Sequence, residues 1–118
     1  MTRTEALEQQ LKGNKTLIEV RDMALKLSEN REFRKLILEG FCLTESARYV
    51  HESADPHLSP EQRADALAMA QAGGHLKRFL SMAVVVGNTA SRELVDVEEA
   101  LEHIRAHGEE AELDRGAE

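Results

Sequence analysis

The chain has 118 residues and a formal net charge of −7, and 42% of its residues are hydrophobic although only 3% are aromatic. This length suits one domain with an aliphatic core. The negative charge argues against a general phosphate-binding surface, which depends on Lys and Arg, so we do not expect nucleic acid as a partner.

The first predicted helix covers about residues 4–28. Its apolar line of Leu7, Leu11, Ile18 and Leu25 has helical spacing. Asn14 and Arg21 fall on the same line, and Gly13 and Asn14 interrupt the pattern. We therefore expect an amphipathic helix whose first turns are loosely attached.

Two shorter helices are predicted next, over about residues 31–40 and 44–54. Asn30 is a suitable N-cap for the first of them, which we expect to end or bend at Gly40. Thr44 is a suitable start for the second. The Asp55-Pro56 pair then stops the helical run.

A very long helix is predicted over about residues 60–107. The run Ser59-Pro60-Glu61-Gln62 has the residues of a capping box with proline at the first helical position. No stop signal follows before about His107, which gives a helix of roughly 65 to 70 Å at 1.5 Å per residue.

This helix carries an uncharged seam at alternating steps of three and four residues, as in a coiled coil. The small residues on its first two thirds would let another backbone approach closely, which explains interior glycines that each cost about 1 kcal/mol of helix propensity. Alternatively, Gly73 and Gly74 break the helix into two. The seam consists of Ala66, Met69, Gly73, Leu76, Leu80, Ala83, Gly87, Ala90, Leu94, Val97, Leu101 and Ile104.

Together these elements predict an all-α fold: one domain over residues 1–107, built as a helical hairpin or bundle with coiled-coil-like packing. Phe79 and the valines at 84–86 make the middle of the long helix apolar on nearly every side, so more than one neighbour must cover it. We therefore expect a homo-oligomer, with a monomeric bundle as the alternative. Residues 108–118 form an acidic tail that we expect to be disordered unless bound.

Signatures of catalysis or of metal binding are lacking in the sequence. His103 and His107 have a metal-pair spacing but no third ligand in a known pattern, and Cys42 lies beside apolar residues that favour an inert thiol. We expect no enzyme activity, no cofactor and no metal.

Charged groups at two places are candidate contacts for a protein partner, with an ordinary solvated surface as the alternative for the basic group. They are Arg31, Arg34, Lys35 and Arg48, and in the tail Glu109, Glu110 and Glu112. The single cysteine and the absence of a targeting segment indicate a cytoplasmic setting, and the apolar run 79–87 is too short to cross a membrane.

Residues 32–94 resemble small helical proteins encoded by tailed bacteriophages. The similar features are the aromatic, basic-apolar and Glu-Gly-aromatic pattern of Phe33 to Phe41, the run Ala47 to Val50, the turn Ala54 to Pro56, and a long helix with a glycine in its middle. The resemblance implies a non-enzymatic component of the virion or of head assembly. It places the protein in the host cytoplasm during infection or in the virion.

The leading functional hypothesis is therefore a structural protein that assembles with itself and with a larger virion component of the head, portal or neck. A small phage effector that binds and inhibits a host protein is the alternative.

Overall fold

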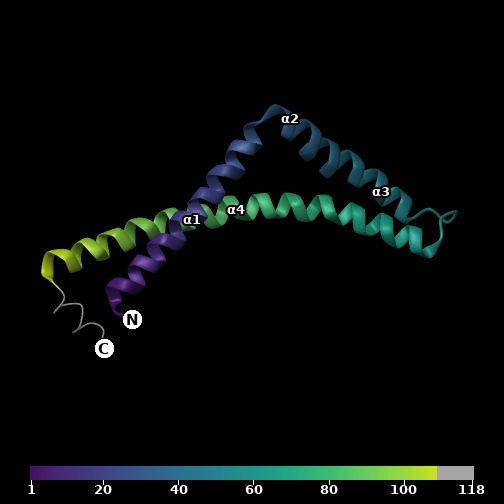
Figure 1. The fold of residues 1–118 in the computed structure, drawn as a ribbon. Helices are drawn as coiled ribbons and strands as arrows, with labels where there is room; N and C mark the ends of the chain where they lie inside the picture. The colour runs from purple at the N-terminus through teal and green to yellow at the C-terminus, as the bar shows by residue number, and fades with distance from the viewer. Residues whose placement is uncertain (109–118) are drawn as a thin grey trace. The chain divides into compact units, whose positions relative to one another are not determined.

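The computed structural model of the protein describes residues 1–108. Its elements are α1 (Arg3–Glu29), α2 (Arg31–Phe33), the π-helix η1 (Arg34–Glu45), α3 (Ser46–Ser53) and α4 (Pro60–His107) (Figure 1). No strand occurs in this part of the chain, so the predicted all-α class with one very long last helix is confirmed. None of the described helices is long and apolar enough to span a membrane.

The predicted helix starts after Asn30 and after Ser59 are built as expected, whereas the predicted start at Thr44 is wrong, because Thr44 lies inside η1. The backbone N–H of Phe33 donates to Asn30 Oδ1 at 2.8 Å. Before α4, the N–H of Gln62 donates to Ser59 Oγ at 3.1 Å, and the N–H of Ser59 donates to Gln62 Oε1 at 2.9 Å. This reciprocal pair is a capping box, and it satisfies two backbone donors that the first turn of a helix leaves without partners.

The last helix ends at a glycine in the left-handed conformation. Gly108 has φ of 79°, and its N–H donates to Ile104 O at 2.7 Å. A residue with a side chain rarely adopts this φ, so glycine is the natural C-terminal cap. The helix runs without a break from Pro60 through Gly73 and Gly74, and the alternative in which these glycines break it is wrong.

The predicted boundary at Gly40 is also wrong. The chain stays helical from Arg31 to Ser53, and its middle twelve residues form a π-helix, in which backbone hydrogen bonds join residues five apart. A Cβ at Gly40 would lie 3.2 Å from the carbonyl oxygen of Lys35, five residues earlier. The missing side chain thus leaves room for the wider turn, and the glycine changes the type of helix instead of ending it.

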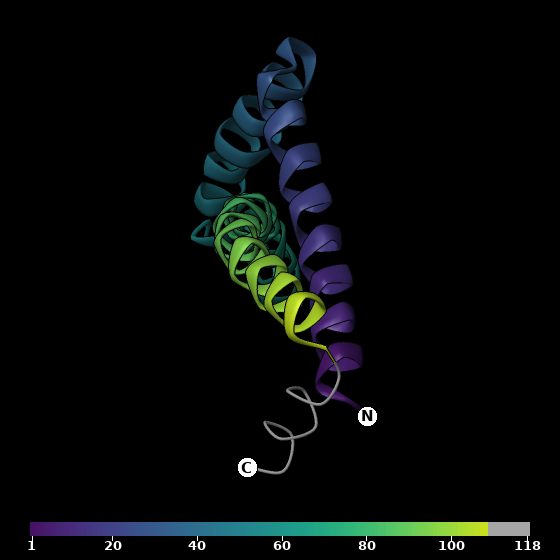
Figure 2. The same cartoon turned by 90° about the vertical axis from the view of Figure 1, so that its left-hand side faces the viewer.

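The sequence predicts one domain, whereas the residues of the structure group into two compact units. Unit 1 combines Met1–Asp22 with the chain from Ala83 onward, and unit 2 is Met23–Met82. Helices α1 and α4 each contribute to both units. In unit 1 the first part of α1 and the last part of α4 run side by side in opposite directions (Figure 2).

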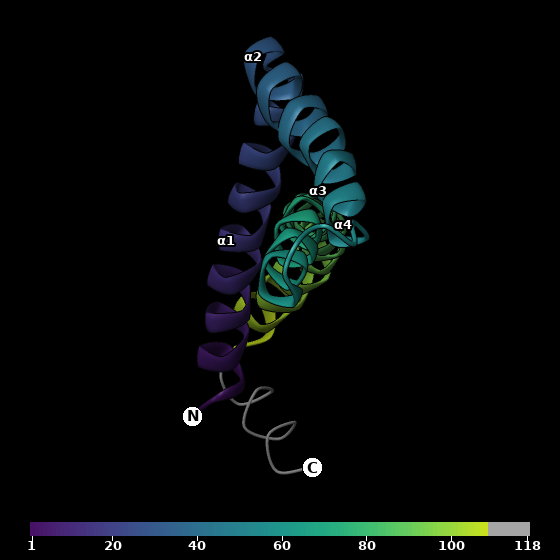
Figure 3. The same ribbon diagram turned by 90° about the vertical axis from the view of Figure 1, so that its right-hand side faces the viewer.

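Unit 2 is a hairpin around the turn between α3 and α4. The continuous run of α2, η1 and α3 approaches the first part of α4 toward its α3 end, whereas α2, which follows the end of α1, lies farther from α4 (Figure 3). Arg63 fastens the turn, because its guanidinium donates to Leu58 O at 2.8 Å. Each unit therefore consists of helices that pack on one another over part of their length.

Candidate interaction surface

In unit 2 the seam of α4 faces the chain's own backbone at Gly73. A Cβ at this position would lie 3.0 Å from Cys42 Cα and would collide with Ser46 Oγ. The Ser46 hydroxyl is itself engaged, donating to Phe41 O at 3.1 Å. The glycine thus permits the close approach of a second backbone that the small seam residues predict, and η1 supplies that backbone.

In unit 1 the seam faces α1, and Gly87 lies under the side chain of Arg21. A Cβ at Gly87 would collide with Arg21 Cβ and would lie 2.8 Å from Arg21 Cγ and 2.9 Å from Arg21 Cδ. The Arg21 guanidinium passes over the glycine and donates to Asn88 Oδ1 at 3.3 Å, and it also pairs with Asp22 at 3.0 Å. Arg21, a polar residue on the apolar line of α1, therefore packs the carbon atoms of its side chain on Gly87.

The rest of the seam is largely covered within the chain. Its exposed member is Met69, with 41% of its surface accessible. Six members are buried, namely Ala66, Gly73, Gly87, Ala90, Val97 and Ile104, and five are half-buried, namely Leu76, Leu80, Ala83, Leu94 and Leu101. Self-association through the seam stays a prediction, but in this fold its small residues serve packing between helices of one chain.

Asn14 is a polar residue buried in unit 1. Its exposed fraction is 4%, and its amide nitrogen Nδ2 has no hydrogen-bond partner. A buried donor without a partner costs about 1 to 3 kcal/mol. In helix pairs, a polar residue on the apolar line is a known device for fixing the register at a cost in stability.

We expect Asn14→Leu to raise the free energy of unfolding by about 1 to 2 kcal/mol, because it removes this unpaired amide. Chemical denaturation followed by circular dichroism measures the change. Gln10→Leu, at an exposed position of the same helix, is the control and should change stability by less than about 0.5 kcal/mol. A loss of stability in Asn14→Leu would contradict the proposed cost of the amide.

The predicted basic group does not act as one unit. Arg48 is engaged within its own helix: its guanidinium pairs with Glu45 at 2.6 Å and with Glu52, and it lies 4.4 Å from the centre of the Tyr49 ring. The other three, Arg31, Arg34 and Lys35, lie exposed at the start of α2 and η1.

The hydrogen bond from Arg48 holds the pKa of Glu45 below its ordinary value, although partial desolvation opposes the shift. The pair therefore contributes above the ordinary pKa of a glutamate, and its contribution is lost as the pH falls through the lowered pKa. The predicted tail contacts Glu109, Glu110 and Glu112 lie outside the described residues.

Exposed hydrophobic side chains are the main feature that the seam does not explain. No large side chain among the described residues is fully buried, whereas fifteen large hydrophobic residues are exposed. Phe79 is 64% exposed, Val85 55% and Val86 37%, so the middle of α4 is open at the positions predicted to need further neighbours. The sequence signal was the apolar character of this helix on nearly every side.

Charge is unevenly divided between the units. Unit 2 has eight basic and eight acidic residues, so it is formally neutral. The described residues of unit 1 carry six Lys and Arg against nine Asp and Glu. Ten of the fifteen exposed large hydrophobic residues lie in the neutral unit.

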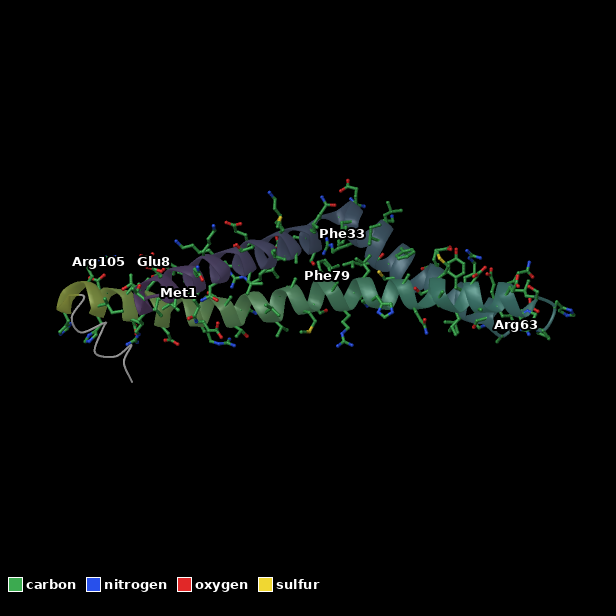
Figure 4. All side chains as sticks on the ribbon, turned by 60° about the horizontal axis from the view of Figure 1, so that its bottom comes forward. Met1, Glu8, Phe33, Arg63, Phe79 and Arg105 are labelled. Carbon is green, nitrogen blue, oxygen red and sulfur yellow. The ribbon has the colours of Figure 1, made fainter. Side chains whose placement is uncertain are left out.

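The hollows inside each unit are shallow and lined by charged residues. The larger one, of about 430 Å³, lies in unit 2, and its lining includes Tyr49, Asp55 and Asp65. One of about 270 Å³ lies in unit 1, where the side chains of Glu8 and Arg105 reach the same end of the helix pair (Figure 4).

The two histidines with a metal-pair spacing lie close together: the ring centres of His103 and His107 are 4.1 Å apart. In residues 1–108, no three His, Cys, Asp or Glu side chains are grouped so that they could hold a metal ion.

Comparison with known proteins gives no relative from which function can be transferred. No protein-family model matches the chain, and neither a curated protein nor a solved structure shows significant similarity to it.

Proposed function

We propose that this protein is a non-enzymatic assembly protein, which associates with itself and with a larger structural protein of a phage particle. The observation that supports this role best is the exposed apolar surface of unit 2, which the chain's own helices leave uncovered. Exposed apolar surface is typical of an interaction site, and ten of the fifteen exposed large hydrophobic residues lie in this unit. The phage context comes from the sequence resemblance over residues 32–94.

The architecture favours this role over a binding cleft. Helices paired two at a time cannot bury a large side chain on every side, so the apolar faces need a further layer. A second protein surface supplies that layer most directly, and the exposed methionines at 23, 69 and 82 can adapt to its shape.

The proposal is tested by the mass of the purified protein in solution. Sedimentation equilibrium over a wide concentration range, or light scattering after size-exclusion chromatography, should show a defined oligomer. A monomer at every concentration would overturn the self-assembly role. Capture of one host protein by such a monomer would instead favour the effector hypothesis, for which the negative charge of unit 1 is suited to a basic groove.

A further inference from the structure

We propose that two copies of this chain pair through unit 2 in antiparallel orientation, with the two-fold axis beside His75. The inference rests on the proposed assembly function and specifies its first step. The contact surface is an uncharged line on α4, here called the Phe79 stripe, which consists of Ala68, Ala72, His75, Phe79 and Met82. Phe79 is marked on α4 in Figure 4.

The Phe79 stripe is a second heptad line on α4. Its members follow at steps of four, three, four and three residues, which keeps them on one side of an α-helix. Each lies one residue before a member of the seam, so the stripe is turned by about 100° from the face that packs on η1. Four of its five members are exposed, including Phe79 at 64% and Met82 at 45%, and Ala72 is half-buried.

The order of small and large residues along the stripe selects the antiparallel orientation. The two alanines lie three and seven residues before His75, and the two large residues lie four and seven residues after it. In an antiparallel pair centred on His75, Met82 of one copy is level with Ala68 of the other, and Phe79 is within one residue of the level of Ala72. Large side chains then face small ones, which lets the helices interdigitate. A parallel pair would place Phe79 on Phe79 and alanine on alanine.

The charges of unit 2 select the same orientation. Its two ends are divided by the crossing of Gly73 with Cys42. The basic end comprises residues 23–42 and 73–82 and carries six basic and three acidic groups. The acidic end comprises residues 43–72 and carries two basic and five acidic groups.

A two-fold axis brings each basic end onto the acidic end of the partner, and the contact occurs twice because the interface is isologous. Charges of this kind contribute orientation more than affinity. The apolar stripe supplies the affinity, and the neutrality of unit 2 avoids the repulsion that the acidic unit 1 would create. Two independent properties of the sequence therefore favour one arrangement.

Substitution at Phe79 tests the surface. Phe79→Ala should weaken self-association by about 30-fold, as expected for an aromatic residue at the centre of an interface. Val95→Ala, at another exposed apolar position of α4, is the matched control and should leave self-association unchanged. Sedimentation equilibrium measures both, and circular dichroism checks that both variants stay helical. Equal effects of the two substitutions would overturn the assignment of the stripe.

Cysteine cross-linking tests the orientation. His75→Cys should form a disulfide-linked dimer on mild oxidation, whereas Lys77→Cys, exposed but off the stripe, should not. Ala68→Cys should not link to itself, because antiparallel copies place the two residues about 21 Å apart along the axis, whereas a disulfide needs Cα atoms within about 7 Å. The natural Cys42 is buried, so it does not compete. Self-linking of Ala68→Cys would show a parallel pair and overturn the proposal.

Charge reversal tests the pairing of the ends. Arg31→Glu with Arg34→Glu should weaken self-association by about tenfold, and adding Glu61→Lys with Asp65→Lys should restore most of it, because the swap re-creates opposite charges. Lack of rescue would contradict the end-to-end pairing.

The outcomes distinguish the two proposals. If the protein forms oligomers but all three tests fail, the assembly function stands and the antiparallel pair is overturned. If the protein is a monomer at every concentration, both proposals are overturned.

Discussion

Gly73→Ala should lower the free energy of unfolding by about 1 to 2 kcal/mol, although alanine is the better helix former. The added Cβ would lie 3.0 Å from the Cα of Cys42 and would collide with Ser46 Oγ. A backbone atom cannot turn aside as the end of a side chain can, so η1 must move away from α4. The overpacking cost then exceeds the gain in helix propensity of about 1 kcal/mol.

The neighbouring glycine is the matched control. A Cβ at Gly74 meets no atom within 4 Å, so Gly74→Ala should raise the free energy of unfolding by about 1 kcal/mol. Denaturant titration of both variants, followed by circular dichroism, measures the opposite signs. If both substitutions stabilise the protein, the contact between Gly73 and η1 does not hold in solution.

Gly87→Leu should destabilise the protein by about 2 to 3 kcal/mol, because Arg21 occupies the space over this glycine. The Cβ of Arg21 is fixed to the backbone of α1, so α1 would have to move away from Gly87, and the guanidinium would lose its hydrogen bond to Asn88 Oδ1 at 3.3 Å. Thermal and chemical denaturation measure the loss. Gly13→Leu is the control, since a Cβ there meets no atom within 4 Å and the substitution should stabilise α1.

A double-mutant cycle identifies the cause of that loss. Arg21→Gly removes every side-chain atom with which a side chain at Gly87 would collide, so the two substitutions should couple by about 0.5 to 3 kcal/mol in the direction of rescue. Strict additivity would mean that Arg21 and Gly87 are not in contact.

The features that local rules determine could be predicted from the sequence. The Asn30 cap, the Ser59 and Gln62 capping box and the extent of α4 follow from hydrogen-bonding groups only a few residues apart. The seam kept its phase through Gly73 because a heptad pattern describes one uninterrupted helix. Its small residues also indicated a close approach of helices, although they could not show that the chain's own helices provide it.

The remaining features depend on contacts distant in sequence. A glycine such as Gly40 is compatible with the end of a helix or with a wider turn, and the π-helix η1 cannot be read from helix propensity, which assumes one hydrogen-bonding pattern. A helix pair within one chain and a helix pair between two chains require the same apolar pattern. The sequence therefore could not show that the Phe79 stripe of α4 is exposed, and only the exposed fractions of its side chains show this. The burial of Asn14 likewise depends on which face of α1 meets α4.

The π-helix η1 also determines how exposed hydrophobic side chains are aligned along the helical run. Three exposed residues, Leu36, Leu43 and Val50, are spaced seven residues apart. In an α-helix of 3.6 residues per turn, this spacing would place them in one apolar line on the same face. The wider turns of the π-helix between Arg34 and Glu45 change this relation, so Leu36 and Leu43 are not aligned as they would be on an α-helix. These exposed residues therefore do not form one continuous apolar line along the helical run.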